Sequence, residues 1–147
     1  MLLKEKLLAD MKDAIKNGDK VRLSTIRLIR TAVLNAEKEK KEELTDPEII
    51  DILVSASKQR KESMKAYEEG GRNDLYEREK LELDILSSYL PEQVSEEEIK
   101  KRVLEIIKEI EADSMKDMGK VMKILMTELK GKAEGSLVNR IVKEALS

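Results

Sequence analysis

The sequence of 147 residues contains no histidine and no cysteine. The absence of histidine excludes a Ser-His-Asp triad, an imidazole base and a histidine metal ligand. The absence of cysteine excludes disulfides, thiol nucleophiles and zinc sites of the cysteine type. Because these are the groups that most active sites use, we predict no catalytic residue, no cofactor and no metal. Carboxylates, Lys, Arg, Ser, Thr and Tyr remain as chemically active side chains.

Phenylalanine and tryptophan are also absent, and aromatic residues make up only 2% of the chain. The hydrophobic fraction of 40% must therefore build its core from Leu, Ile, Val, Met and Ala. Two prolines and six glycines are few, and a chain dominated by Ala, Glu, Lys, Leu and Arg is typical of long helices. Charged residues make up 41% but nearly cancel to −2, so the net charge argues neither for nor against a nucleic-acid partner.

Long apolar runs are missing as well. No segment approaches the ~18 apolar residues of a membrane-spanning helix. The opening MLLKEKLLADMK lacks the apolar centre and small-residue cleavage site of a signal peptide. We therefore expect a cytoplasmic protein with no membrane partner.

Apolar residues recur at helical spacing along almost the whole chain, and the alternation of a β-strand is missing. Four N-terminal helices are predicted. The first ends at Asn17-Gly18, and the second fades into the charge run EKEKKEE. The third begins at Thr45 with a capping box to Glu48 and ends at Gly70-Gly71. The fourth ends before Pro91.

The segment YLPEQVSEEE is the best domain boundary, because Pro91 stops one helix and Ser95 with Glu98 can cap the next. Three short helices follow, the second over residues 116–129 and the third over residues 136–146. We predict an all-α protein with an N-terminal bundle of about four helices (1–92) and a small C-terminal three-helix domain (93–147).

Charge is uneven across that boundary. Residues 114–147 contain seven basic and four acidic side chains, whereas residues 95–113 contain four basic and seven acidic ones. On a helix, spacings of 4, 3, 4 and 3 place one set of polar residues on a single stripe: Lys116, Lys120, Lys123, Thr127 and Lys130. Such a stripe is either a solvated surface or a binding face for about 3–5 phosphates. Arg140, Lys143 and Lys132 add to the basic excess, and Gly119, Gly131 and Gly135 lie near helix ends, where a partner can approach the backbone.

A second polar group lies among apolar residues. Arg60 follows Leu53 by seven residues, and Glu79 follows Leu75 by four, so both lie on apolar helix faces. In an antiparallel hairpin that turns near Gly71, Arg60 falls opposite residues 79–83. We predict a structural ion pair of Arg60 with Glu79 or Glu82 rather than an active site.

Several separated motifs resemble the GatB/YqeY family. They are RLSTIRLIR, KQRKES, GGRNDL, SSYLPEQVSEEE and MGKVMKILMTELKGKAEGSLVNRIVKEAL, in this order and over nearly the whole chain. The likeness is to the free-standing YqeY-like proteins and, in the C-terminal part, to the tail domain of the B subunit of glutamine-dependent Asp/Glu-tRNA amidotransferase. The resemblance implies an all-α fold and a tail that docks on tRNA, with catalysis elsewhere.

The tail motif is matched by Gly119, Lys120, Lys130, Gly131, Lys132, Gly135 and Asn139. The sequence departs from the family at Met126-Thr127-Glu128, where a Met-Pro-Lys-like turn is expected, and the acidic Glu128 would weaken a phosphate contact. The complete predicted tRNA-binding set is Lys116, Gly119, Lys120, Lys123, Lys130, Gly131, Lys132, Gly135, Asn139, Arg140 and Lys143.

We therefore predict a protein that binds tRNA or another structured RNA and is not an enzyme by itself. One alternative is a helical adaptor that binds the amidotransferase or another translation protein. Another is an accessory carbon–nitrogen ligase activity with glutamine as amido donor, as an inherited family property. The oligomeric state stays open.

Overall fold

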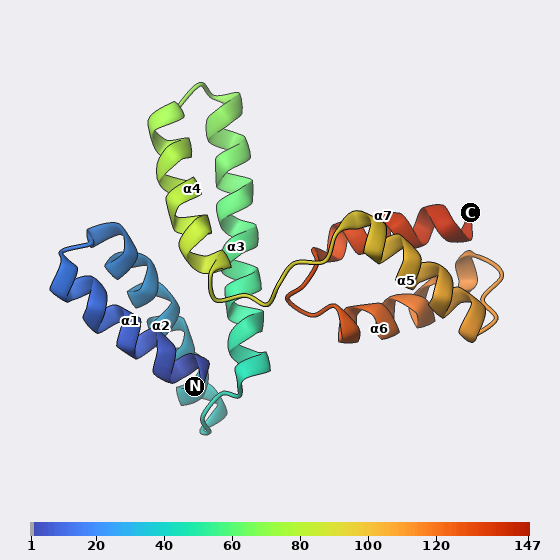
Figure 1. The fold of residues 1–147 in the computed structure, drawn as a ribbon, viewed down its shortest axis with the longest axis horizontal. Coiled ribbons are helices and arrows are strands. Elements are labelled where there is room, and N and C mark those ends of the chain that lie inside the picture. Colours follow the sequence, from blue (N-terminus) through green and yellow to red (C-terminus); the bar gives the residue numbers. More distant parts are fainter. Residues whose placement is uncertain (1) are drawn as a thin grey trace. The chain divides into compact units, whose positions relative to one another are not determined.

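The computed structural model describes residues 2–147, and in this range the chain forms seven α-helices, one short 3-10 helix and no strand (Figure 1). The elements are α1 (Leu3–Asn17), α2 (Lys20–Lys40), α3 (Asp46–Glu69), α4 (Asn73–Ser87), α5 (Glu96–Glu109), η1 (Met115–Asp117), α6 (Met118–Glu128) and α7 (Gly135–Leu146). The predicted all-α fold class is confirmed. The chain divides into two compact units, Met1–Leu90 and Pro91–Ser147, and the domain limits 1–92 and 93–147 stay a prediction.

Local side chains set the helix ends. Gly18 adopts a left-handed conformation with φ 67° and ends α1, as predicted. Thr45 and Glu48 form the predicted capping box at the start of α3. The Ser95 hydroxyl accepts a hydrogen bond from the Glu98 amide at 3.2 Å and caps α5.

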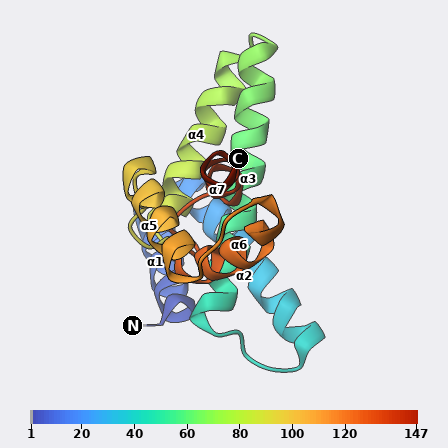
Figure 2. The ribbon, with the colours of Figure 1, turned by 90° about the vertical axis from the view of Figure 1, so that its right-hand side faces the viewer.

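The N-terminal unit is built from two helical hairpins, α1 with α2 and α3 with α4. The α3 and α4 helices run side by side in both views of the ribbon (Figures 1 and 2). One aliphatic cluster joins the four helices, and Tyr89 is its single aromatic member: Leu7, Ile26, Ile29, Val33, Ile49, Leu53, Leu86 and Tyr89. The core of this unit is thus aliphatic apart from one tyrosine.

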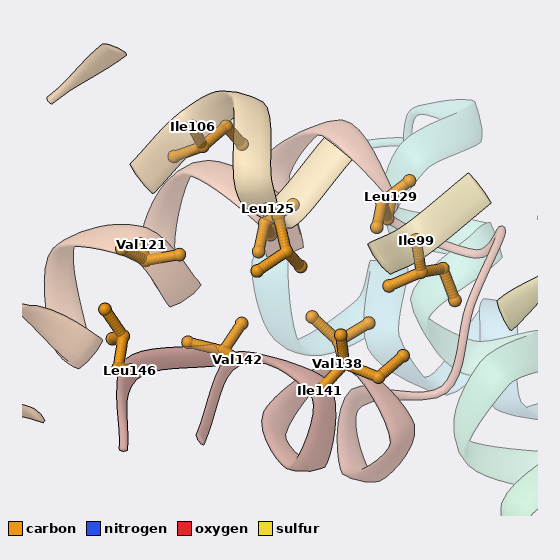
Figure 3. Close-up of a cluster of buried hydrophobic side chains, with 10 residues drawn as sticks. Ile99, Ile106, Val121, Leu125, Leu129, Val138, Ile141, Val142 and Leu146 are labelled. Atoms are coloured by element: carbon orange, nitrogen blue, oxygen red, sulfur yellow. The ribbon is translucent and has the colours of Figure 1, made fainter. Parts of the chain in front are cut away.

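The C-terminal unit packs α5, α6 and α7 around a second aliphatic cluster, most of which is labelled in Figure 3. Ile106 of α5, Leu125 of α6 and Val142 of α7 are all fully buried in it. The loop between α6 and α7 is tied to the start of the unit, because the Val94 amide donates to the Lys132 carbonyl at 2.8 Å. Each of these helices buries one apolar stripe in the core, and its opposite side faces solvent.

The predicted helix over residues 116–129 is shorter than expected. Its first turn is the 3-10 helix η1, in which the Asp117 carboxylate accepts a hydrogen bond from the Asp113 amide at 3.1 Å. At the other end Gly131 has a φ of 74°, which reverses the chain. Lys116 and Lys130 therefore flank α6 rather than lie on it.

Within residues 2–147, none of the helices combines the length and apolar character needed to cross a bilayer.

We expect Leu125→Ala to destabilise the C-terminal unit by about 2–5 kcal/mol, because it leaves a cavity in a small core. Hydrogen exchange measured by mass spectrometry should show faster exchange of the α5, α6 and α7 amides. Leu104→Ala is the matched control, because Leu104 is 61% exposed on α5. Equal acceleration in both variants would contradict this account of the core.

Candidate nucleic-acid interface

The outward side of α6 carries lysines. Lys120, Lys123 and Thr127 are exposed, whereas Val121 and Leu125 on the opposite side are fully buried. The Thr127 hydroxyl donates to the Lys123 carbonyl at 2.9 Å and so is satisfied within the helix. The lysine ammonium groups consequently define the chemistry of this side.

The remaining predicted residues lie in the α6–α7 loop and on α7. Lys132 is exposed in the loop, and Asn139, Arg140 and Lys143 are exposed on α7. The Arg140 guanidinium lies 2.8 Å from a Glu96 carboxylate oxygen, so its charge is partly balanced. The predicted set thus occupies the outward sides of two helices and the loop between them.

The three glycines of the predicted set differ. A side chain at Gly119 would meet no atom within 4 Å, so this exposed position leaves open space beside the backbone. Gly135 starts α7 and faces the Met126 methyl group, which would lie 3.5 Å from an added Cβ. Gly131 is buried and serves the turn. Of these three positions, Gly119 is the one that offers a partner close approach.

Most of the lysines lack an acidic partner. Across residues 2–147, no carboxylate forms an ion pair with Lys116, Lys123, Lys132 or Lys143. Lys120 lies near Asp117 and helps to lower the pKa of that carboxyl, although the main cause is the hydrogen bond from the Asp113 amide. Lys130 interacts with another group of the protein, so it is not counted among these lysines. The positive potential of this region is therefore only partly cancelled.

Glu128, the predicted weak point of the basic face, is held by Arg102 of α5. The two carboxylate oxygens of Glu128 accept from Nη2 and Nε of Arg102 at 2.6 and 2.7 Å. This bidentate pair keeps the pKa of Glu128 below its usual value. The acid therefore faces an arginine of the same unit, which also pairs with Glu105 and Glu109.

The methionines of α6 are core residues. Met118, Met122 and Met126 are partly buried and pack against the aliphatic cluster. Met115 in η1 is 40% exposed. The flexible methionine side chains fill gaps around the core of the C-terminal unit, and the exposed side of α6 is polar.

The structure also brings together Arg60, Glu79 and Glu82. Arg60 Nε lies 2.9 Å from Glu82 Oε2 and 3.5 Å from Glu79 Oε2, between α3 and α4. Arg78 approaches the other Glu82 oxygen at 3.8 Å. Loss of hydration, followed by the charge of Glu82, raises the pKa of Glu79. Two carboxylates thus share one largely buried guanidinium, an arrangement that fixes the register of a hairpin.

Sequence reasoning missed a second polar cluster, around Tyr89. The buried Tyr89 hydroxyl donates to Asp10 Oδ2 at 2.6 Å, and Arg22 lies 3.5 Å from Asp10 and 2.9 Å from Asp13. Burial raises the pKa of Tyr89, and the bond to Asp10 adds to this effect. Tyr89 and Asp10 are 79 positions apart, so no local pattern indicates the contact. The cluster joins α1, α2 and the segment after α4. Among residues 2–147, no group of three or more acidic side chains is arranged to hold a metal ion.

These features define an all-α protein with a hairpin-based N-terminal unit and a three-helix C-terminal unit that exposes lysines. The sequence pattern of a family described as "Yqey-like protein" matches residues 4–146. The chain therefore belongs to this family, and the resemblance stated from the sequence motifs is confirmed.

Several known proteins are similar to this chain. "Altered inheritance of mitochondria protein 41, mitochondrial" of Pyrenophora tritici-repentis is 31% identical over 144 residues, which cover 96% of this chain and 79% of that protein. The protein of the same name from Kluyveromyces lactis is 32% identical over 105 residues, or 69% of this chain and 56% of the relative. Their name includes "mitochondrial", so the cytoplasmic location stays a prediction.

A third similarity is shorter but has a higher identity. A glutamyl-tRNA(Gln) amidotransferase subunit of Methanobrevibacter smithii is 46% identical over 57 residues, which cover 36% of this chain and 9% of that protein. The shared part is therefore a small fraction of the amidotransferase protein. The two proteins are thus similar in this segment, and most of the amidotransferase subunit has no counterpart in this chain.

The shared guanidinium predicts opposite effects for two isosteric changes. Glu82→Gln removes the nearest partner of Arg60 and should cost about 1–3 kcal/mol of unfolding free energy at pH 7. Glu79→Gln should leave stability unchanged or slightly higher, because it removes a carboxylate that is poorly hydrated and close to Glu82.

The pH dependence provides the control. Because the pKa of Glu79 is raised in the folded state, its protonation favours folding below its ordinary pKa of about 4.5. That contribution is lost as the pH rises through the folded-state pKa. In urea unfolding from pH 4 upward, the unfolding free energy of Glu79→Gln should therefore rise relative to that of the wild type as the pH increases. A gain that grows toward lower pH instead would refute this assignment.

Proposed function

We propose that this protein binds tRNA or a similar structured RNA through its C-terminal unit and has no catalytic residues of its own. The observation that carries the proposal is the outward side of α6, where Lys120 and Lys123 face solvent and no large apolar side chain accompanies them. Lys116, Lys132 and Lys143 add ammonium groups without an ion-pair partner among residues 2–147. Such groups suit a polyanion, because compact ammonium charges bind phosphates in a salt-dependent way.

The proposed contact reads shape rather than sequence. The last aromatic residue of the chain is Tyr89, so the C-terminal unit has no ring on which a base can stack. Lysines that contact phosphates position an RNA but do not identify its bases. A folded RNA with closely spaced phosphates, such as tRNA, fits this surface better than an extended single strand.

Arg102 pairs the acid at the C-terminal end of α6. It holds both oxygens of Glu128, so this carboxylate is directed toward α5. Glu105 and Glu109 of α5 also lie 3.0 and 3.4 Å from Arg102. One arginine thus faces three carboxylates, and we place this cluster outside the proposed RNA-binding surface.

The similarity to an amidotransferase protein suggests where such binding would be used. We propose an accessory role in tRNA amidation or translation, in which the chemistry belongs to another protein. The similarity covers 9% of that relative, so the activity of the amidotransferase is not transferred to this chain.

We predict that bulk tRNA binds the full chain with a log–log salt slope of about −2 to −4. The double variant Lys120→Glu/Lys123→Glu should weaken binding at least about tenfold and reduce the slope by about 2, because two phosphate contacts are lost. Fluorescence anisotropy of labelled tRNA at several salt concentrations measures both quantities.

The matched control is Lys101→Glu/Lys108→Glu. Both lysines are exposed on α5 of the same unit, so the change in net charge is identical. An unstructured polyuridine of similar length serves as the control ligand. Absence of tRNA binding by the wild type, or equal weakening by both double variants, would refute the proposed interface.

A further inference from the structure

The first part of α2 has an unusual charge pattern. Residues 20–36 include Lys20, Arg22, Arg27 and Arg30 and no acidic residue, although charged residues of both signs make up 41% of the whole chain. The first acid of the helix is Glu37. This segment is therefore basic, and its apolar residues are too numerous to be used by the core alone.

Two of the four cations have partners inside the N-terminal unit. Arg22 binds Asp10 and Asp13 of α1, and the Arg30 guanidinium lies 3.2 Å from the Met11 sulfur. Lys20 and Arg27 are exposed, and no carboxylate within residues 2–147 forms an ion pair with either of them. Two positive charges thus stay unbalanced on the outward side of α2.

Exposed leucines accompany these charges. Leu28 is 54% exposed and Leu34 is 49% exposed, while Ile29 and Val33 on the opposite side of α2 are buried. A shallow hollow of about 420 Å³ lies between the cations and is lined by Lys20, Leu23, Ser24, Arg27, Leu28 and Thr31. We call these six residues, together with Leu34, the α2 face.

We propose that the α2 face binds an acidic amphipathic helix of another protein. Leucines of such a helix would enter the hollow beside Leu28, and its carboxylates would meet Lys20 and Arg27. The surface therefore offers exposed leucines and a complementary charge, the two features by which an acidic amphipathic helix can be recognised.

Two other occupants fit less well. A second copy of this chain, docked through the same face, would place two positively charged patches against each other, because a two-fold interface uses the same surface on both copies. A nucleic acid would leave Leu28 and Leu34 against phosphates, which gain nothing from apolar contact. The α2 face thus differs from the outward side of α6, where lysines stand without exposed leucines.

A synthetic probe tests this proposal. We would use a fluorescein-labelled helical peptide of about 18 residues with one leucine stripe flanked by glutamates, long enough to be helical when bound. The expected result is saturable binding to the full wild-type chain. Arg27→Glu and Leu28→Asp should each weaken it about tenfold or more, as for residues at the centre of an interface.

Two controls match these changes. Leu81→Asp alters an α4 leucine that is 53% exposed, and Lys65→Glu reverses an exposed charge on α3, so neither should affect binding. The same peptide with lysines in place of glutamates should bind Lys20→Glu/Arg27→Glu better than the wild type. This exchange of preference keeps the test valid even if a single variant is less stable.

Each other outcome would overturn the proposal. No peptide binding by the wild type at about 1 mM would exclude the site at useful affinity. Self-association of the wild type that Leu28→Asp abolishes would assign the face to a second copy. Loss of tRNA binding in Arg27→Glu, without loss of peptide binding, would assign it to RNA. The tRNA titration of the α6 lysine variants is independent of these measurements.

Discussion

Each helix of this protein buries one narrow aliphatic stripe, and the remaining features of the structure follow from that requirement. The chain contains no Phe or Trp, so both cores consist of aliphatic side chains and Met, with Tyr89 as the one aromatic member. Side chains of this size fill a core only when every helix contributes its stripe. The opposite side of each helix is then released from packing, and its residues are free to serve solubility or recognition.

Polar side chains inside the N-terminal unit set geometry rather than chemistry. Arg60 with Glu79 and Glu82 links α3 to α4, and Tyr89 with Asp10 links α1 to the segment after α4. Buried groups of this kind add little net stability, because desolvation offsets much of their attraction. Their effect is to select one register among the several that an aliphatic core would accept.

Sequence reasoning succeeded where the controlling contacts are local. Gly18 and Thr45 end and begin helices through bonds to residues a few positions away, so their roles can be derived from spacing. The encounter of Arg60 with α4 also follows from spacing, because one tight turn at Gly71 sets the hairpin register. The Tyr89–Asp10 and Arg102–Glu128 contacts span 79 and 26 positions and depend on how helices pack, which no local pattern contains. The sequence also indicated which lysines share a stripe, but not that Lys116 and Lys130 lie outside α6, because the 3-10 turn η1 and the end of α6 at Glu128 carry no clear signal in the spacing.

The two basic surfaces differ in the side chains that accompany their charges, and this difference is why we propose different partners for them. On α6 the cations are lysines beside Thr127 and the open backbone of Gly119, a setting in which a hydrated phosphate can approach without displacing apolar contacts. On α2 the cations stand beside Leu28 and Leu34, which keep their apolar surface in water unless a partner covers it. A polyanion without apolar groups leaves those leucines hydrated, whereas an acidic helix removes them from water and pairs the charges in the same step. The balance of apolar and charged groups, rather than positive charge alone, is therefore our reason for proposing RNA as the partner of the outward side of α6 and a protein helix as the partner of the α2 face.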